Sequence, residues 1–291
     1  MRLHLKNMTL MGSFCLMLLH TGLSFAYVKG IYLSENTARN GEKIDYLIKE
    51  AKITGLNTFV IDANAHNALY EKNVRKVVAS GIHYVARITV FPGGATASQI
   101  HDRAIWEKRL ALAKYAISLG ADEIQLDYIR YSSKDGIASP QKARDVYRVI
   151  QYFRANLPAR IPLEIDIFGI STFKPAPTIG QNPAMFAPSL SGICPMVYPS
   201  HYEPYKYYAV RPYKTIYESV EALKKQLPPG SKVAIYAYIE TYNYRYPMTI
   251  AERVHYGAEQ IKAAKAAGAQ GFYVWSASNE YSVLFSILKQ K

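Results

Sequence analysis

The sequence has 291 residues, of which 49% are hydrophobic, and it carries 35 Lys and Arg against 22 Asp and Glu. A chain of this length forms one large domain or two small ones, and no Pro-, Gly- or Ser-rich linker, low-complexity tract or charge block divides it. Two cysteines exclude a disulfide-based scaffold, so the fold must rely on its hydrophobic core.

Residues 1–26 have the features of a secretory signal peptide. Arg2 and Lys6 precede a short apolar run, which ends in the small-residue pattern Ser24-Phe25-Ala26. We therefore predict cleavage after Ala26 and a secreted or periplasmic protein with no transmembrane segment after cleavage. An uncleaved membrane anchor is the alternative, although the apolar run is short for a membrane span.

The mature chain, residues 27–291, would contain one cysteine, Cys194, and 33 basic against 22 acidic residues, which gives a net charge of +11. Its lysines are spread over helix-like segments such as "EALKKQLPPGSK". Together with export, this spread argues against a nucleic-acid partner. The basic residues then form either an ordinary solvated surface or one that attracts anionic polymers of the cell envelope.

Four segments share one local pattern: "TGLNTFVID", "SGIHYVARI", "LGADEIQLD" and "AGAQGFYVW". In each, a Gly follows a helical stretch and precedes an apolar strand. Gly supplies the left-handed backbone that ends a helix, so each segment reads as a joint from a helix to a strand. Thr249 and Glu252 have the spacing of a capping box at the start of a late helix.

Extending this pattern predicts strands near residues 28–34, 57–62, 83–91, 122–128, 161–167, 192–198, 232–239 and 270–275. Helices are predicted near residues 41–54, 71–80, 100–119, 139–156, 214–227, 249–267 and 280–289. Alternating strands and helices imply a parallel sheet, and this number of units predicts a single (β/α)8 TIM barrel over residues 27–291. A doubly wound open sheet is the alternative, but no Gly-rich phosphate-binding fingerprint follows the first strand.

The active site of such a barrel is built at the C-terminal ends of its strands. Nearly every predicted strand carries a polar or aromatic residue there. The candidates, in chain order, are Asp62, Asn64, Arg87, Asp127, Arg130, Asp166, Tyr198, His201, Glu240, Trp275 and Asn279. One Asp at a strand end is commonly a helix cap or a turn former. That explanation does not account for four carboxyl groups that converge on one face.

Paired carboxyl groups among aromatic rings are what cleavage of a glycosidic bond requires, because one protonates the leaving oxygen while the other attacks or activates water. We predict Asp127 as nucleophile or base and Asp166 as general acid, with Glu240 as the alternative catalytic acid. The other candidates would bind substrate. No spaced set of His or Cys residues accompanies His201, so we predict neither a metal nor a cofactor.

Several segments resemble the putative glycosyl hydrolase domain family of bacteria, which is grouped with the TIM-barrel glycosidases. They include "VKGIYLS", "VARITVF", "LAKYAISLGADEIQLDYIRYSS", "IDIFGIST", "ICPMVYPSHY" and "YVWSASNEYS". The resemblance runs from about Val28 to Tyr281. It implies a TIM barrel that hydrolyses a polysaccharide or an envelope glycan.

The sequence departs from the family pattern at two strands. Relatives tend to have Asp-Val-Lys after the second strand, where this chain has Asp62, Ala63 and Asn64. They tend to have a Trp-Leu-Gln-Asp-Phe type segment on the seventh strand, where this chain has "YAYIETY" with Glu240. A barrel that binds glycans or peptidoglycan without cleaving them is therefore an alternative function, and another hydrolytic or lyase chemistry at the same rim is a third.

The hypothesis has a geometric consequence. Asp127 and Asp166 should emerge on one rim of neighbouring strands, with carboxyl groups about 5 to 9.5 Å apart. Arg87 or Arg130 should lie within reach of one carboxylate, while burial raises the pKa of the other so that it can act as the acid.

Overall fold

The structure, a computed structural model, describes residues 27–64, 66–134 and 136–290. The predicted signal peptide at residues 1–26 lies outside these residues and stays a prediction. Among the described residues, no helix combines the length and apolar character needed to cross a membrane.

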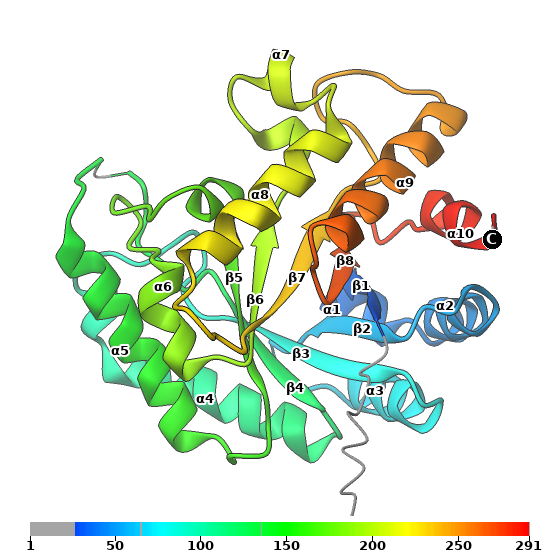
Figure 1. Cartoon of the computed structure of the whole chain (residues 1–291). Coiled ribbons are helices and arrows are strands. Elements are labelled where there is room, and N and C mark those ends of the chain that lie inside the picture. The colour runs from blue at the N-terminus through cyan, green and yellow to red at the C-terminus, as the bar shows by residue number, and fades with distance from the viewer. Residues whose placement is uncertain (1–26, 65, 135, 291) are drawn as a thin grey trace, which may run out of the picture.

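Eight parallel strands form a closed barrel in which each strand pairs with its neighbours in chain order, and β8 closes onto β1 (Figure 1). The strands are β1 Val28–Leu33, β2 Thr58–Asp62, β3 His83–Thr89, β4 Glu123–Asp127, β5 Leu163–Phe168, β6 Gly192–Met196, β7 Ala234–Ile239 and β8 Gly271–Val274. The predicted barrel is confirmed, with strand boundaries within two residues of those expected, and the alternative of an open sheet is wrong.

Helices surround the barrel, as Figure 1 shows. They are α1 Glu35–Arg39, α2 Gly41–Thr54, α3 Ala68–Ala79, α4 Arg103–Ser118, α5 Pro140–Asn156, α6 Pro183–Phe186, α7 Tyr205–Tyr208, α8 Pro212–Gln226, α9 Ile250–Ala266 and α10 Ser282–Lys289. Short 3-10 helices lie at Gln99–His101, Gly169–Thr172, Ala187–Ser189 and Pro199–His201. The connection from β5 to β6 contains α6 and two 3-10 helices in place of one long helix.

The local signals in the sequence act as predicted. Gly55 and Gly120 have φ angles of 70° and 102°, a left-handed backbone that side chains disfavour, so each helix ends there and the chain turns into the next strand. At the start of α9, Thr249 and Glu252 form the expected capping box. These contacts fix where the strands begin, and therefore how far each strand reaches toward the C-terminal end of the barrel.

The core has two parts. Larger apolar side chains fill the layer between strands and helices, while Tyr32, Val60, Val85, Tyr238 and Tyr273 pack inside the barrel. Because side chains alternate along a strand, the inward-facing position two residues further along each strand lies nearer the C-terminal rim. The barrel interior is therefore filled by rings and apolar side chains toward the N-terminal ends of the strands. The polar inward-facing residues gather at the C-terminal end, which we call the upper rim.

A buried polar group also lies inside the barrel. Gln125 donates to Glu164 over 3.0 Å, and the Cys194 thiol donates to the same carboxyl group over 3.4 Å. Burial raises the pKa of Glu164 well above its ordinary value, with a further contribution from nearby Glu123. Glu164 is one inward-facing position below Asp166 on β5, so it supports the layer beneath the rim.

We predict that Gly30→Ala destabilises the barrel by about 1–3 kcal/mol, because a Cβ atom would lie 2.5 Å from the buried ring of Tyr273. Gly41→Ala is the control, since its Cβ atom would meet Asn73 at an ordinary contact distance of 3.5 Å. Urea unfolding measures both free energies. Equal stability of the two variants would contradict this account of the interior packing.

Candidate active site

One guanidinium group organises the upper rim. Arg87 of β3 donates to Asp62, the last residue of β2, and to Asp127, the last residue of β4. Its Nε lies 3.7 Å from Oδ2 of Asp166 on β5. Four consecutive strands therefore contribute to one cluster of three carboxyl groups around one arginine, which we call the Arg87 cluster.

The strand register explains why these groups meet. Asp62 pairs with Arg87 across β2 and β3, and Gln125 pairs with Glu164 across β4 and β5. Asp127 and Asp166 each lie two residues beyond that second pair, so they reach the rim at the same level with side chains turned inward. This position excludes Asp127 from the outer helical layer.

Tyr32 completes the cluster from β1. Its hydroxyl donates to Oδ2 of Asp62 over 2.6 Å, and its ring lies 5.2 Å from the Arg87 guanidinium carbon. The guanidinium is thereby held between an acid and an aromatic face, which restricts its rotation.

Asp166 is the most deeply buried member of the cluster, with 2% of its surface exposed. Burial raises the pKa of Asp166 well above its ordinary value; the negative charges of Asp127 and Asp62 raise it further, while Arg87 lowers it. Its Oδ1 atom has no hydrogen-bond partner. One guanidinium cannot balance three negative charges in a buried site, so Asp166, the most buried of the three, is the carboxyl group whose protonated form is favoured most.

The backbone turns sharply after Asp127. Tyr128 has a φ angle of 51°, an uncommon conformation for a residue with a side chain, and its N–H donates to Oδ1 of Asp127 over 2.5 Å. Strain of this kind costs on the order of 1–3 kcal/mol and persists where the surrounding structure imposes it. The Asp-Tyr pair thus ends the strand and fixes the orientation of the carboxylate.

Arg130 does not contact either predicted catalytic acid. Its guanidinium carbon lies 4.6 Å from the ring of Phe168 and 5.4 Å from that of Tyr128, and its Nη1 donates to the carbonyl of Tyr131 over 2.8 Å. Burial lowers the pKa of Arg130. Arg130 therefore packs against the rings of Tyr128 and Phe168, which line the cavity described next.

Above the Arg87 cluster lies a cavity of about 190 Å³. It adjoins a second space of about 470 Å³, and the two share Phe168, Met196, Tyr198 and His201 as lining residues. We call the combined space the cleft. Arg87, Asp127 and Asp166 lie at its base, while Tyr198 and Trp275 form an aromatic wall with ring centroids 5.8 Å apart.

Glu240 lies apart from the Arg87 cluster. Its carboxyl group accepts from the N–H and the hydroxyl of Ser200, each over 2.9 Å, and from the Tyr256 hydroxyl over 2.8 Å. Burial raises the pKa of Glu240 to about 7. His201 lies 3.8 Å from it and lines the cleft, so Glu240 supports the cleft wall from behind.

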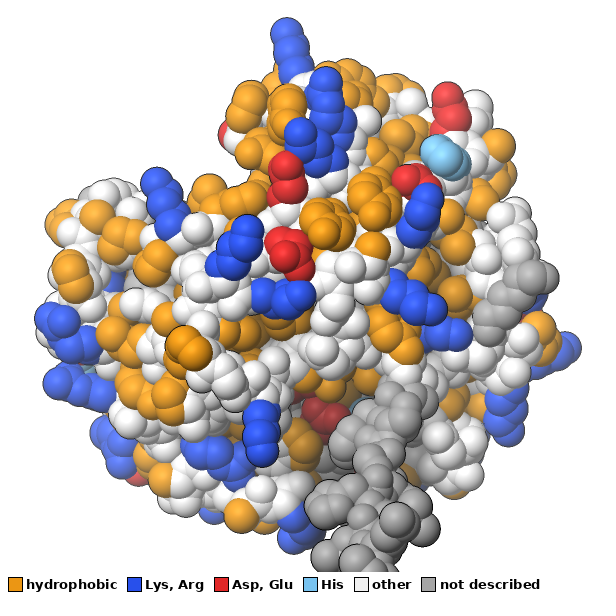
Figure 2. Space-filling model, viewed as in Figure 1, with side chains coloured by type: hydrophobic (Ala, Val, Ile, Leu, Met, Phe, Trp, Pro, Cys, Tyr) orange, Lys and Arg blue, Asp and Glu red, His pale blue; other side chains and the backbone are white. Residues whose placement is uncertain are grey.

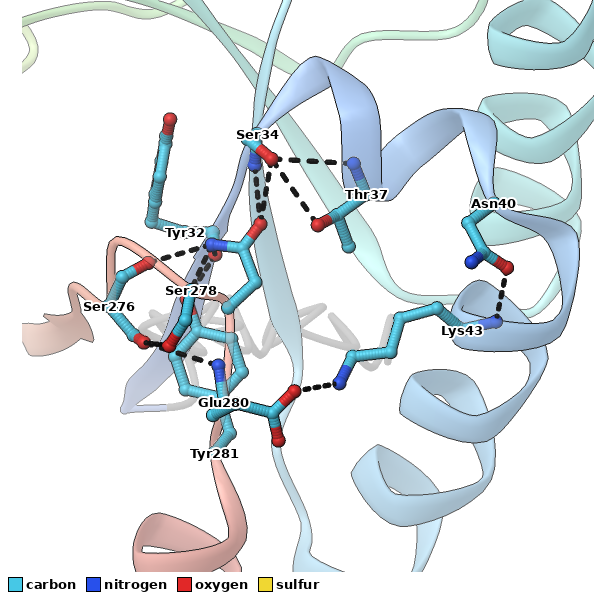
Figure 3. Close-up of polar contacts among 10 residues, drawn as sticks. Tyr32, Ser34, Thr37, Asn40, Lys43, Ser276, Ser278, Glu280 and Tyr281 are labelled. Carbon is cyan, nitrogen blue, oxygen red and sulfur yellow. Dashed lines mark hydrogen bonds and ion pairs between the residues drawn. The ribbon is translucent and has the colours of Figure 1, made fainter.

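Asn279 connects β8 back to β1. Its Oδ1 accepts from the Ser34 N–H over 2.8 Å, and its Nδ2 donates to the Ser276 carbonyl over 2.8 Å. Figure 3 shows the surrounding contacts, which join the end of β1 to residues 276–281 and include the Glu280–Lys43 ion pair of 2.6 Å. Asn279 is 1% exposed, and the hydrogen-bonding groups of its side chain are used by Ser34 and Ser276. Asn64, by contrast, is exposed on the surface.

Sequence reasoning missed several residues of the site. Tyr32, Tyr128, Phe168, Met196 and Tyr238 either contact the Arg87 cluster or line the cleft. Phe168 and Tyr238 could have been found by counting two residues from Asp166 and Glu240, because that spacing marks inward-facing positions. Among the described residues, no group of three or more His, Cys, Asp or Glu side chains is arranged to hold a metal ion.

We predict that Glu240→Gln flattens the dependence of stability on pH. The folded protein holds the Glu240 proton up to about pH 7, whereas the unfolded chain releases it near the ordinary value of 4.5. The free energy of unfolding of the wild type should therefore fall as pH rises through this window, by at most roughly 3 kcal/mol from this group. Urea unfolding from pH 4 to pH 9 measures both proteins, and parallel curves would contradict the prediction.

Solved structures with the same architecture include several glycosidases. The spore cortex-lytic enzyme SleL of Bacillus cereus has a TM-score of 0.62 at 14% identity, covering 90% of this chain and 74% of that chain. The endo-β-1,4-mannanase of Thermotoga petrophila has a TM-score of 0.65 at 12% identity, covering 92% and 76%. The chitinase of Chromobacterium violaceum has a TM-score of 0.60 at 13% identity, covering 91% and 98%.

At these identities the likeness shows the shared fold. No protein with a curated function matches the sequence. The family model of the putative glycosyl hydrolase domain matches residues 93–281, well over half of the chain and including both Asp127 and Asp166. The resemblance found in the sequence motifs is thereby confirmed: the chain belongs to the putative glycosyl hydrolase domain family.

Proposed function

We propose that this protein is an exported glycoside hydrolase that cleaves a polysaccharide by a paired-carboxylate mechanism. Family membership and the barrel shared with glycosidases support glycoside hydrolysis. The single observation that carries the mechanism is the Arg87 cluster at the base of an aromatic-walled cleft. Export rests on the predicted signal peptide alone.

The proposed roles follow from the different surroundings of the two acids. Asp166 keeps its proton because it is buried beside other carboxylates, so it protonates the oxygen of the leaving sugar. Asp127, paired with Arg87, attacks the anomeric carbon or activates a water molecule. Asp62 adds negative charge near the oxocarbenium-like transition state and anchors Arg87.

The walls of the cleft suit a sugar chain. Tyr198 and Trp275 offer flat apolar faces to sugar C–H groups, and the Tyr198 hydroxyl and the His201 imidazole offer polar atoms to sugar hydroxyls. Burial and the charge of Arg245 lower the pKa of His201, so the ring is neutral near pH 7 and can both donate and accept. The two parts of the cleft together, about 470 and 190 Å³, accommodate more than one sugar unit.

One observation favours the alternative of a barrel that binds glycans without cleaving them. Both oxygens of Asp127 already accept a hydrogen bond, one from Arg87 and one from the Tyr128 N–H. Each carboxylate oxygen has a second lone pair, so attack stays open to it, but its nucleophilicity is reduced. Product analysis separates the two functions, because a binding protein releases no reducing ends.

We expect Asp127→Asn to lower the rate of polysaccharide cleavage by about 100- to 10,000-fold, because the amide can neither attack nor accept a proton. The measurement is release of reducing ends from a panel of bacterial envelope polysaccharides. Asp45→Asn, which removes an exposed carboxylate paired with Lys76, is the matched control and should keep full activity. An active Asp127→Asn protein would end this assignment.

We also expect the rate of cleavage to fall at alkaline pH, as Asp166 loses its proton. This alkaline limb of the pH–rate profile should move in the variant Asp62→Asn. The negative charge of Asp62 raises the pKa of Asp166, so its removal lowers that pKa and frees Arg87 to lower it further. The pH at which kcat falls on the alkaline side should therefore be lower in Asp62→Asn than in the wild type. An unmoved limb would show that another group supplies the proton.

A further inference from the structure

A cavity larger than either part of the cleft lies outside it. It is a groove of about 810 Å³ between the N-terminal ends of α8 and α9, and Tyr213, Tyr246, Met248, His255 and Tyr256 are among its lining residues. We call it the α8–α9 groove. Among the described residues, the groove and the cleft have no lining residue in common.

The groove combines aromatic faces with charged edges. Tyr213, Tyr246 and Met248 line it with aromatic and apolar side chains, and Arg211 and Glu259 add charged ones to the lining. Figure 2 shows hydrophobic side chains interleaved with Lys and Arg over the projection that α7, α8 and α9 form above the barrel. A dry protein interface would be depleted of such charges, whereas a hydroxyl-rich ligand uses both kinds of group.

A ridge of rings joins the groove to the cleft. His201, which lines the cleft, lies 5.4 Å from the ring of Tyr244, and the Tyr244 side chain is 72% exposed. Next to Tyr244 along the chain, the Arg245 guanidinium lies over the ring of Tyr205 at 4.8 Å. Tyr205 in turn lies 6.3 Å from Tyr246 in the groove wall.

The ridge is held in place by polar contacts. Arg245 donates to the carbonyl of Ser200 over 3.2 Å and to Glu203 over 3.1 Å, and Asn243 donates to the carbonyl of Ala209 over 2.8 Å. These bonds tie the loop after β7 to the loop after β6. The rings between the cleft and the groove are therefore carried by loops that are anchored to each other, which lets a long and semi-rigid chain bind with little loss of entropy.

We propose that the α8–α9 groove is an accessory binding site for the polysaccharide substrate, whose chain runs from the cleft over the Tyr244 ridge into the groove. The ligand named here rests on the proposed function. An accessory site tethers the polymer, so that each entry of a segment into the cleft becomes an intramolecular event at raised effective concentration. The site distinguishes long chains from short ones, which cannot reach it while occupying the cleft.

The test compares binding of polymers by the wild type and the double variant Tyr213→Ala/Tyr246→Ala. Affinity electrophoresis in gels that contain glycol chitin or glucomannan, and sedimentation with peptidoglycan sacculi, measure the dissociation constants. Loss of two stacking rings should raise the dissociation constant for a bound polymer by about tenfold. Tyr256 is left intact because its hydroxyl donates to buried Glu240.

Two controls keep the test decisive. Tyr46→Ala removes a more exposed tyrosine, 45% exposed, from α2, away from the groove, and should bind as the wild type does. Tyr213→Phe/Tyr246→Phe keeps both rings and should also bind as the wild type does, which separates loss of stacking from misfolding of the alanine variant. Equal binding by wild type and alanine variant, or loss of binding in Tyr46→Ala to the same degree, would overturn the proposal.

The remaining outcomes separate this inference from the proposed function. A wild type that binds none of the three polymers overturns the accessory site. A wild type that binds a polymer through the groove but releases no reducing ends supports the accessory site and refutes the proposed hydrolase. Asp127→Asn should retain groove-dependent binding, because its side chain lies at the base of the cleft and not in the groove.

Discussion

The arrangement of the site depends on Arg87. Without its positive charge, three carboxyl groups brought together by β2, β4 and β5 would repel one another in a buried space that water cannot screen. The barrel supplies the proximity, since closure forces the ends of consecutive strands onto one rim. Arg87 supplies the charge balance, and because one guanidinium faces three carboxyl groups, the pKa of buried Asp166 stays well above its ordinary value.

The fold could be predicted because its signals are local. Gly55 and Gly120 each end a helix just before the chain turns into a strand, and Thr249 with Glu252 starts α9. The alternation of helices and strands is therefore visible from residues that are neighbours in the sequence. The α-helices that were missed are α1, α6 and α7, which have four or five residues each, and the short 3-10 helices after β5 and β6 were missed as well. Such segments are too short to show a helical period and depend on tertiary contacts.

The site was predictable only in part, because strand-end position is local but hydrogen-bond partners are not. The position of Asp127 and Asp166 at one rim follows from the alternation of strands and helices. The partners of Glu240 do not, since Ser200 is 40 residues and Tyr256 16 residues away in the sequence. Arg87 and Arg130 look equivalent in the sequence, yet one lies inside the barrel among acids and the other packs against rings.

The features that weaken the fold at this rim are the ones that the proposed chemistry needs. Tyr128 is held in a strained conformation, and a carboxyl oxygen of Asp166 is buried without a partner, so both cost stability. The packed layers of the barrel and its helices offset these costs. If both oxygens of Asp166 had hydrogen-bond partners within the protein, the fold would be more stable, but the acid would hold its proton in an internal hydrogen bond. In the proposed mechanism, the unpaired oxygen keeps that acid available to a sugar oxygen that enters the cleft.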